Sequence, residues 1–205
     1  MFPSRRIVTS GGDVYRNEYS LQFDGSNDYV SLGNLGFTDS QGSIVAWVKV
    51  DTSLNSDGVI FAAVDDGGSA DYHLIFYYDE PAEVLKFAQK NGDTADKVSG
   101  DTDINDGKWH HVAIVSTGSA YALYIDGLAE SLTVENANSG DWFGDTSNLD
   151  RYEIGAYDGT VPFAGKIDSV GIWDTALSSS QVKTLYNNRE PFNAKNIALS
   201  SLKAY

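Results

Sequence analysis

Seven Asp-Gly or Asn-Gly pairs divide the chain, and their spacing constrains the fold more than any other feature of the sequence. They stand at residues 24–25, 57–58, 66–67, 91–92, 106–107, 126–127 and 158–159. Both residues of such a pair tolerate a positive φ, which tight hairpin turns require. Short β-rich segments lie between these turn signals from about residue 19 to about residue 174. This arrangement predicts an antiparallel β-sandwich.

Two segments indicate deeply buried strands. Residues 43–50 (SIVAWVKV) place apolar side chains on both faces of a strand. Val45 and Trp47 lie on one face, and Ile44, Ala46, Val48 and Val50 lie on the other. Such a pattern is typical of a central strand covered on both sides. Residues 59–64 (VIFAAV) are continuously apolar and predict a second buried strand.

The remaining strands follow in pairs or singly. We predict them at residues 72–78 and 84–88 as one hairpin, at 109–116 and 121–126 as another, and at 128–134, 152–157 and 163–173. The predicted fold class is all-β: an antiparallel sandwich with one short C-terminal helix.

That helix is predicted from a capping box. Ser178 and Gln181 have the S-x-x-Q spacing, and Val182, Leu185 and Tyr186 recur at helical intervals. Pro191 is expected to stop the helix. In the tail beyond it, residues 197, 199 and 202 are apolar and can pack on a neighbour.

Four motifs in order resemble the laminin-G-like domains of the concanavalin A-like lectin/glucanase group. They are residues 20–30 (SLQFDGSNDYV), 43–49 (SIVAWVK), 106–113 (DGKWHHVA) and 163–173 (FAGKIDSVGIW). The resemblance covers residues 19–187 and implies a jelly roll of two curved sheets, a fold that lectins, glycosidases, adhesive modules and virion proteins share. We divide the chain into an N-terminal arm (1–18), a laminin-G-like domain (19–190) and a C-terminal tail (191–205).

The charge of the chain bears on its partners. The net charge is −15, and so acidic a surface repels phosphate backbones and anionic lipid headgroups. We therefore expect no nucleic-acid partner, and no apolar run is long enough for membrane insertion. The chain has no cysteine, so it has neither a disulfide framework nor a thiol nucleophile.

Catalysis of the glucanase type is not expected. Glucanases of this fold carry a Glu-x-Asp-x-x-Glu strand, and none of the seven Glu residues here has those companions. The alternative of a catalytic carboxylate pair assembled from distant strands stays open. The His110–His111 pair points to opposite faces of a strand, so we expect it to be structural and not a chelating pair.

Calcium is the expected cofactor, in a structural role. In several relatives the acidic residue of the closing strand, here Asp168, ligates calcium near the opening turns. The resemblance therefore implies a site of Asp168 with Asp24, Asp28 and the turn around Gly42. The alternative is that Asp24 and Asp28 cap turns while Asp168 accepts backbone hydrogen bonds.

A polar loop around residues 136–148 is the candidate ligand-binding segment. Sugars are held by aromatic platforms and by Asp or Asn side chains on their hydroxyls, so we select a set of five residues: Asp141, Trp142, Asn148, Tyr157 and Asp158. The alternative is that Trp142 and Phe143 anchor a long loop on the sandwich.

These features predict a non-catalytic surface recognition or adhesion module that binds carbohydrate. Residues 1–7 (MFPSRRI) have two arginines but no apolar run behind them, unlike a secretory signal. We therefore expect an extracellular or virion-surface setting, such as a phage fibre or capsid decoration. A homo-oligomer or a capsid or fibre assembly would suit that setting. The alternatives are a structural virion protein that contacts protein neighbours without sugar, and a glycoside hydrolase of the same fold.

Overall fold

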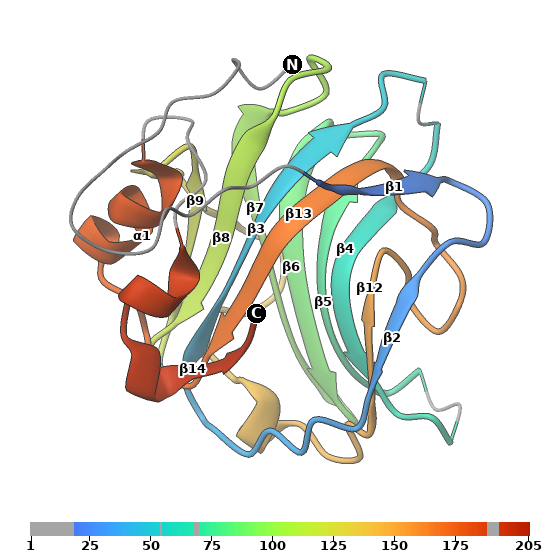
Figure 1. Cartoon of the computed structure of the whole chain (residues 1–205). Helices are drawn as coiled ribbons and strands as arrows, with labels where there is room; N and C mark the ends of the chain where they lie inside the picture. The colour runs from blue at the N-terminus through green and yellow to red at the C-terminus, as the bar shows by residue number, and fades with distance from the viewer. Residues whose placement is uncertain (1–18, 54, 68–69, 188–192) are drawn as a thin grey trace.

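A computed structural model of the chain describes residues 19–53, 55–67, 70–187 and 193–205. The predicted N-terminal arm and Pro191 lie outside the described residues. The described part forms two packed antiparallel sheets with one helix on the outside (Figure 1), which confirms the predicted fold class. Within these residues, no helix is long and apolar enough to cross a bilayer.

Sheet A has the order β1-β13-β3-β8-β9-β10, and β14 also pairs with β13. Its strands are β1 (Leu21–Asp24), β13 (Ala164–Trp173), β3 (Gly42–Val50), β8 (His110–Ser116), β9 (Tyr121–Ile125), β10 (Leu128–Ala129) and β14 (Leu202–Ala204). The central strand β3 is buried on both faces, as its sequence predicts, because the core between the sheets covers its inner face and α1 (Ser179–Tyr186) covers the outer side. The described part of the tail is joined to the sandwich through β14.

Sheet B has the order β11-β7-β6-β5-β4-β12-β2. Its strands are β11 (Thr133–Val134), β7 (Thr94–Asp103), β6 (Val84–Asn91), β5 (Tyr72–Asp79), β4 (Gly58–Val64), β12 (Arg151–Ile154) and β2 (Val30–Gly33). The β5–β6 hairpin is confirmed with the predicted turn between its strands. The segment 128–134 is not one strand, because its start pairs with β9 in sheet A and its end with β7 in sheet B.

The main core lies between the two sheets. Alternate residues of each strand meet there, and the largest buried members are aromatic: Tyr78, Phe61, Phe76, Phe87, Trp142, Tyr152 and Phe163. Burying such side chains is worth about 1.5–3 kcal/mol each. This packing fixes which side chains of sheet B are left pointing outward.

The helix α1 begins at the predicted capping box. The Ser178 hydroxyl accepts the Gln181 N–H at 3.3 Å, and the Gln181 carboxamide accepts the Ser178 N–H at 2.8 Å. The helix ends earlier than Pro191, because Asn187 takes the left-handed conformation with φ 45°. Val182 and Leu185 pack onto the outer face of sheet A. Three short 3₁₀ turns complete the described structure: η1 (Phe143–Asp145), η3 (Ala194–Asn196) and η4 (Leu199–Ser201).

Candidate functional site on the outer face of sheet B

The outward side of sheet B, which we call the B face, carries cross-strand rows of side chains that are partly exposed on β5 and β6 and buried on β4. Strand pairing sets His73, Ile75 and Tyr77 of β5 beside Lys90, Ala88 and Lys86 of β6. The B face comprises Val59, Ala62, Val64, His73, Ile75, Tyr77, Lys86, Ala88, Lys90, Lys97, Arg151 and Glu153. Val59, Ala62 and Val64 of β4 are buried, with Ile75, Tyr77 and Tyr157 packed against them, so rings and charged groups make up the exposed surface.

A hairpin turn adds two of the predicted ligand-binding residues to this face. Tyr157 and Thr160 exchange backbone hydrogen bonds of 2.8 and 2.7 Å around Asp158 and Gly159, whose φ angles are 50° and 64°. These angles are those of a primed hairpin turn, which an Asp-Gly pair favours. The ring of Tyr157 packs edge-on against His73 with centroids 5.8 Å apart. Tyr157 and Asp158 therefore lie together at the rim of the B face.

Ion pairs hold the charged groups of the B face in place. Lys86 lies 3.0 Å from Asp79 and 2.8 Å from Glu135, and Lys97 lies 3.1 Å from the other oxygen of Glu135. Burial opposes the charge of Glu135, but hydrogen bonds from both lysines outweigh it and lower the pKa of this carboxyl. The B face thus presents fixed donors and acceptors beside aromatic rings.

The structure corrects the expectation for Trp142. Its side chain is fully buried, stacked on Phe87 with centroids 5.6 Å apart. A buried indole offers no face to a sugar, so Trp142 anchors its loop, which is the alternative set out above. Asp141 lies in the same loop, where its carbonyl accepts a hydrogen bond from Tyr121. Its N–H lies 3.4 Å from Oδ2 of Asp96, the neighbour of Lys97 in β7, and neither Asp141 nor Trp142 is a member of the B-face rows.

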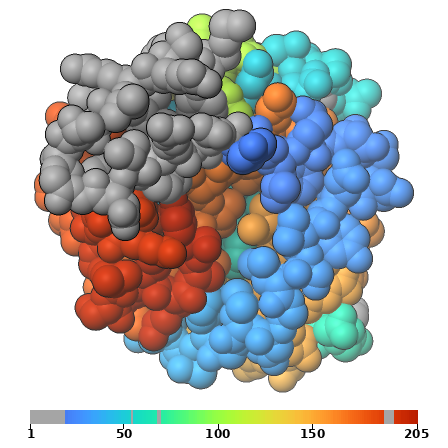
Figure 2. Space-filling view, in the orientation of Figure 1, coloured from blue at the N-terminus to red at the C-terminus, as the bar shows by residue number. Residues whose placement is uncertain are grey.

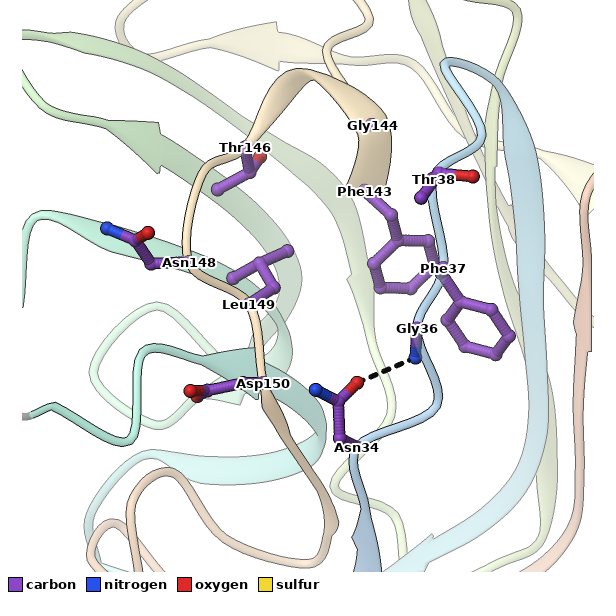
Figure 3. A pocket seen from close by; sticks show the side chains of 10 residues that line it. All are labelled: Asn34, Gly36, Phe37, Thr38, Phe143, Gly144, Thr146, Asn148, Leu149 and Asp150. Atoms are coloured by element: carbon purple, nitrogen blue, oxygen red, sulfur yellow. Dashed lines mark hydrogen bonds between the residues drawn. The ribbon is translucent and has the colours of Figure 1, made fainter.

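Asn148 lines a separate cavity at the loop end of the sandwich (Figure 3). This cavity has a volume of about 300 Å³ and lies between residues 34–38 and residues 143–150. Phe143 and Leu149 point into it, and the Asn34 carboxamide is turned to accept the Gly36 N–H at 2.8 Å. The five predicted ligand residues are thus dispersed: Tyr157 and Asp158 lie on the B face, Asn148 at this cavity, Trp142 in the core and Asp141 in the partly buried loop.

The three carboxylates predicted to bind calcium are not brought together. Asp24 Oδ1 accepts the Ser26 N–H at 2.8 Å and Asp28 Oδ2 accepts the Asp24 N–H at 3.0 Å, so both cap the opening turn. In the β1–β13 register Asp24 faces Ala164, four residues before Asp168, which corresponds to about 13 Å along the strand. Gly42 is equally remote, because Asp168 faces Trp47 instead. These residues do not fit a shared metal ion, and no other group of three or more metal-ligating side chains occurs among the described residues.

Asp168 instead borders an apolar hollow between the sheets, visible in Figure 2 between β1 and the C-terminal tail. The hollow has a volume of about 390 Å³, with Ile154 and Ile167 at its base and Leu21 and Tyr205 at its sides. Its surface is mostly aliphatic and aromatic, and Ser20, Asp168 and Ser169 are the non-aromatic polar residues in its lining.

The chain belongs to the concanavalin A-like lectin/glucanases superfamily, whose laminin G-type family model matches residues 24–183. A curated relative, the mouse sushi, von Willebrand factor type A, EGF and pentraxin domain-containing protein 1, is 30% identical over 175 residues. The match covers 82% of this chain and 5% of the relative, so the chain spans a small part of that protein.

Solved structures share the fold at low sequence identity. The CBM40 of Ruminococcus gnavus IT-sialidase, bound to α2,3-sialyllactose, has a TM-score of 0.65 at 18% identity, covering 82% of this chain and 98% of that one. Domain 4 of AbnA, an extracellular arabinanase from Geobacillus stearothermophilus, in complex with arabinotriose, also has a TM-score of 0.65, at 21% identity. That match covers 88% of this chain and 84% of the other.

Proposed function

We propose that the chain is a non-catalytic carbohydrate-binding module and that the B face is its glycan-binding surface. The observation that carries this proposal is the arrangement of the B face itself. Three partly exposed rings, those of His73, Tyr77 and Tyr157, lie on this face over a buried apolar layer and are flanked by ion-paired donors and acceptors. The sugar-bound structures of the same fold support the proposal.

The chemistry of a sugar matches this surface. A pyranose has apolar C–H faces, which pack on aromatic rings, and a belt of hydroxyls that donate and accept hydrogen bonds. Tyr77 and Tyr157 supply ring surface, and Lys86 and Glu135 supply a donor and an acceptor already fixed by their ion pair. Fixed side chains lose little conformational entropy on binding.

The state of the carboxylates supports binding without hydrolysis. A glycosidase needs a general acid whose pKa is raised. The Glu135 carboxyl has a lowered pKa, because Lys86 and Lys97 donate to its charged form. Glu153 is buried and bonded to Arg151. Neither Glu is available as a proton donor on the B face.

We propose an extracellular setting, in keeping with the extracellular arabinanase to which one structural neighbour belongs. Display on a virus particle, an oligomeric state and calcium binding stay predictions from the sequence.

Binding to an array of oligosaccharides and polysaccharides, followed by calorimetry on the best ligand, tests the proposal. Tyr77→Ala and Tyr157→Ala should each weaken binding by about tenfold, because an aromatic packing surface is lost. Tyr19→Ala is the matched control, since Tyr19 is 85% exposed and borders the hollow beside β1 of sheet A. Absence of binding across the array would contradict the carbohydrate function. Unchanged affinity in both B-face variants would contradict the location.

A further inference from the structure

We infer that the B face takes uncharged glycans and rejects acidic ones, because its basic side chains are already neutralised by carboxylates of the chain. The inference rests on the proposed function and names the class of ligand for the same surface. It depends on Arg151, the one arginine of the B face as defined above.

Arg151 is bonded to three carboxylates. Its Nε and Nη2 lie 2.8 and 2.7 Å from Glu153 Oε1, and its Nη1 lies 3.1 Å from Asp66 Oδ1 and 2.6 Å from Asp158 Oδ1. A carboxylate of a ligand would have to displace one of these partners. The guanidinium therefore has little capacity left for an acidic sugar.

The buried Glu153 carboxylate keeps the Arg151 guanidinium from turning away to bind a ligand. The Glu153 side chain is fully buried, and its second oxygen accepts the Gly159 N–H at 3.1 Å. Withdrawing Arg151 would leave a buried carboxylate without its counter-charge, which is strongly destabilising. Arg151 and Glu153 thus act as positioning residues that hold the Tyr157–Thr160 turn against the sheet.

The lysines of the B face are neutralised in the same way. Lys86 and Lys97 share Glu135, Lys86 also bonds Asp79, and Lys90 lies 2.6 Å from Asp71. With Arg151 and its partners, four basic side chains are paired with six carboxylates on a chain of net charge −15.

The excess of carboxylates over basic side chains opposes the binding of a ligand carboxylate at both short and long range. At close range the ligand would meet more carboxylates than cations, and like charges brought together at an interface cost several kcal/mol. Beyond contact distance the acidic surface repels it over about 8 Å at physiological salt. Hydroxyl groups pay no such cost, because they can donate to the carboxylates and accept from the ammonium groups. The chain shares its fold with a sialyllactose-binding module, but we expect the two to differ in the charge of the glycans that they bind.

The test is an array of neutral oligosaccharides, each printed beside its sialylated or uronic-acid counterpart. The wild-type chain should bind neutral members at least about tenfold better than their acidic counterparts. Asp158→Asn, which removes one carboxylate from Arg151, should narrow that ratio several-fold. Asp39→Asn is the control of equal charge change away from the B face and should leave the ratio unchanged.

The outcomes separate this inference from the function on which it rests. Equal or tighter binding of the acidic members would overturn the inference and leave carbohydrate binding in place. If Asp158→Asn and Asp39→Asn change the ratio of neutral to acidic glycan binding by the same amount, the role of Arg151 and its carboxylate partners would be overturned. Failure to bind any member would overturn both.

Discussion

His111 makes the stability of the sandwich sensitive to acid. It is 1% exposed, and its ring packs against Trp47 and Tyr186, with centroids 5.4 and 6.3 Å away. Neither ring nitrogen has a hydrogen-bond partner. Burial lowers the pKa of His111 to about 4, and the charge of Asp126 opposes this only in part. The folded chain therefore holds this imidazole in its neutral form.

The size of the effect follows from the two pKa values. Above pH 6.5 the ring is neutral in both states and contributes no pH dependence. Between 6.5 and 4 the unfolded chain takes up a proton that the folded chain refuses, so the free energy of unfolding falls as the pH falls. At about 1.4 kcal/mol per pH unit, the loss is about 2 kcal/mol at pH 5 and about 3 kcal/mol at pH 4.

Urea unfolding followed by tryptophan fluorescence measures this loss, with His111→Leu as the comparison. Leucine is of similar size and does not titrate, so the variant should lack this part of the pH dependence while all other groups stay the same. The difference in unfolding free energy between wild type and variant should therefore shift by about 2 kcal/mol between pH 7 and pH 5. Parallel loss of stability in the two proteins would refute the buried, neutral state of His111.

Four further results are expected. His110 is half-buried, which opposes its charge, but hydrogen bonds to Asp126 and Asp106 outweigh this and raise its pKa. Its contribution to stability is present below about pH 6.5 and lost as the pH rises through the folded pKa, so His110→Gln should cost more stability at pH 5.5 than at pH 8.5 in the same urea assay. Trp142→Ala should cost about 3–5 kcal/mol in thermal or urea unfolding, and a loss under about 1 kcal/mol would show that this indole is not buried in solution. Ser178→Ala should cost about 1 kcal/mol by removing the helix cap, with no change in glycan affinity. Stripping with EGTA should leave the melting temperature unchanged, because Asp168 is not brought together with Asp24 and Asp28; a lower melting temperature in the stripped protein would instead support the calcium prediction from the sequence.

The sequence predicts most of the strands because burial leaves a period in the residue pattern. β3 and β4 are apolar on both faces or throughout, and the β5–β6 hairpin alternates around a clear turn. β7 was not predicted, since its sequence TADKVSGDTD has Val98 as the one large apolar residue. Pairing with β6 and β11 forms this strand, and such long-range partners leave no local signal.

The site is less readable from the sequence than the fold. Tyr157 and Asp158 were selected for their residue types, and the structure places them on the rim of the B face. Tyr77, Lys86 and Lys97 were missed, because an outward lysine on a strand has the same pattern whether it is solvated or part of a site. Trp142 was misassigned for the converse reason, since its polar neighbours in sequence conceal a core position reached only by tertiary packing.

Chemical-shift mapping with the tightest neutral glycan tests the location and character of the ligand surface together. The account predicts that the largest amide shifts fall on β4, β5, β6 and β12 and on the Tyr157–Thr160 turn, and that they diminish in Tyr77→Ala. Shifts concentrated instead around Asn34 and residues 143–150, or in the hollow beside Ile167, with the B face unaffected, would contradict it.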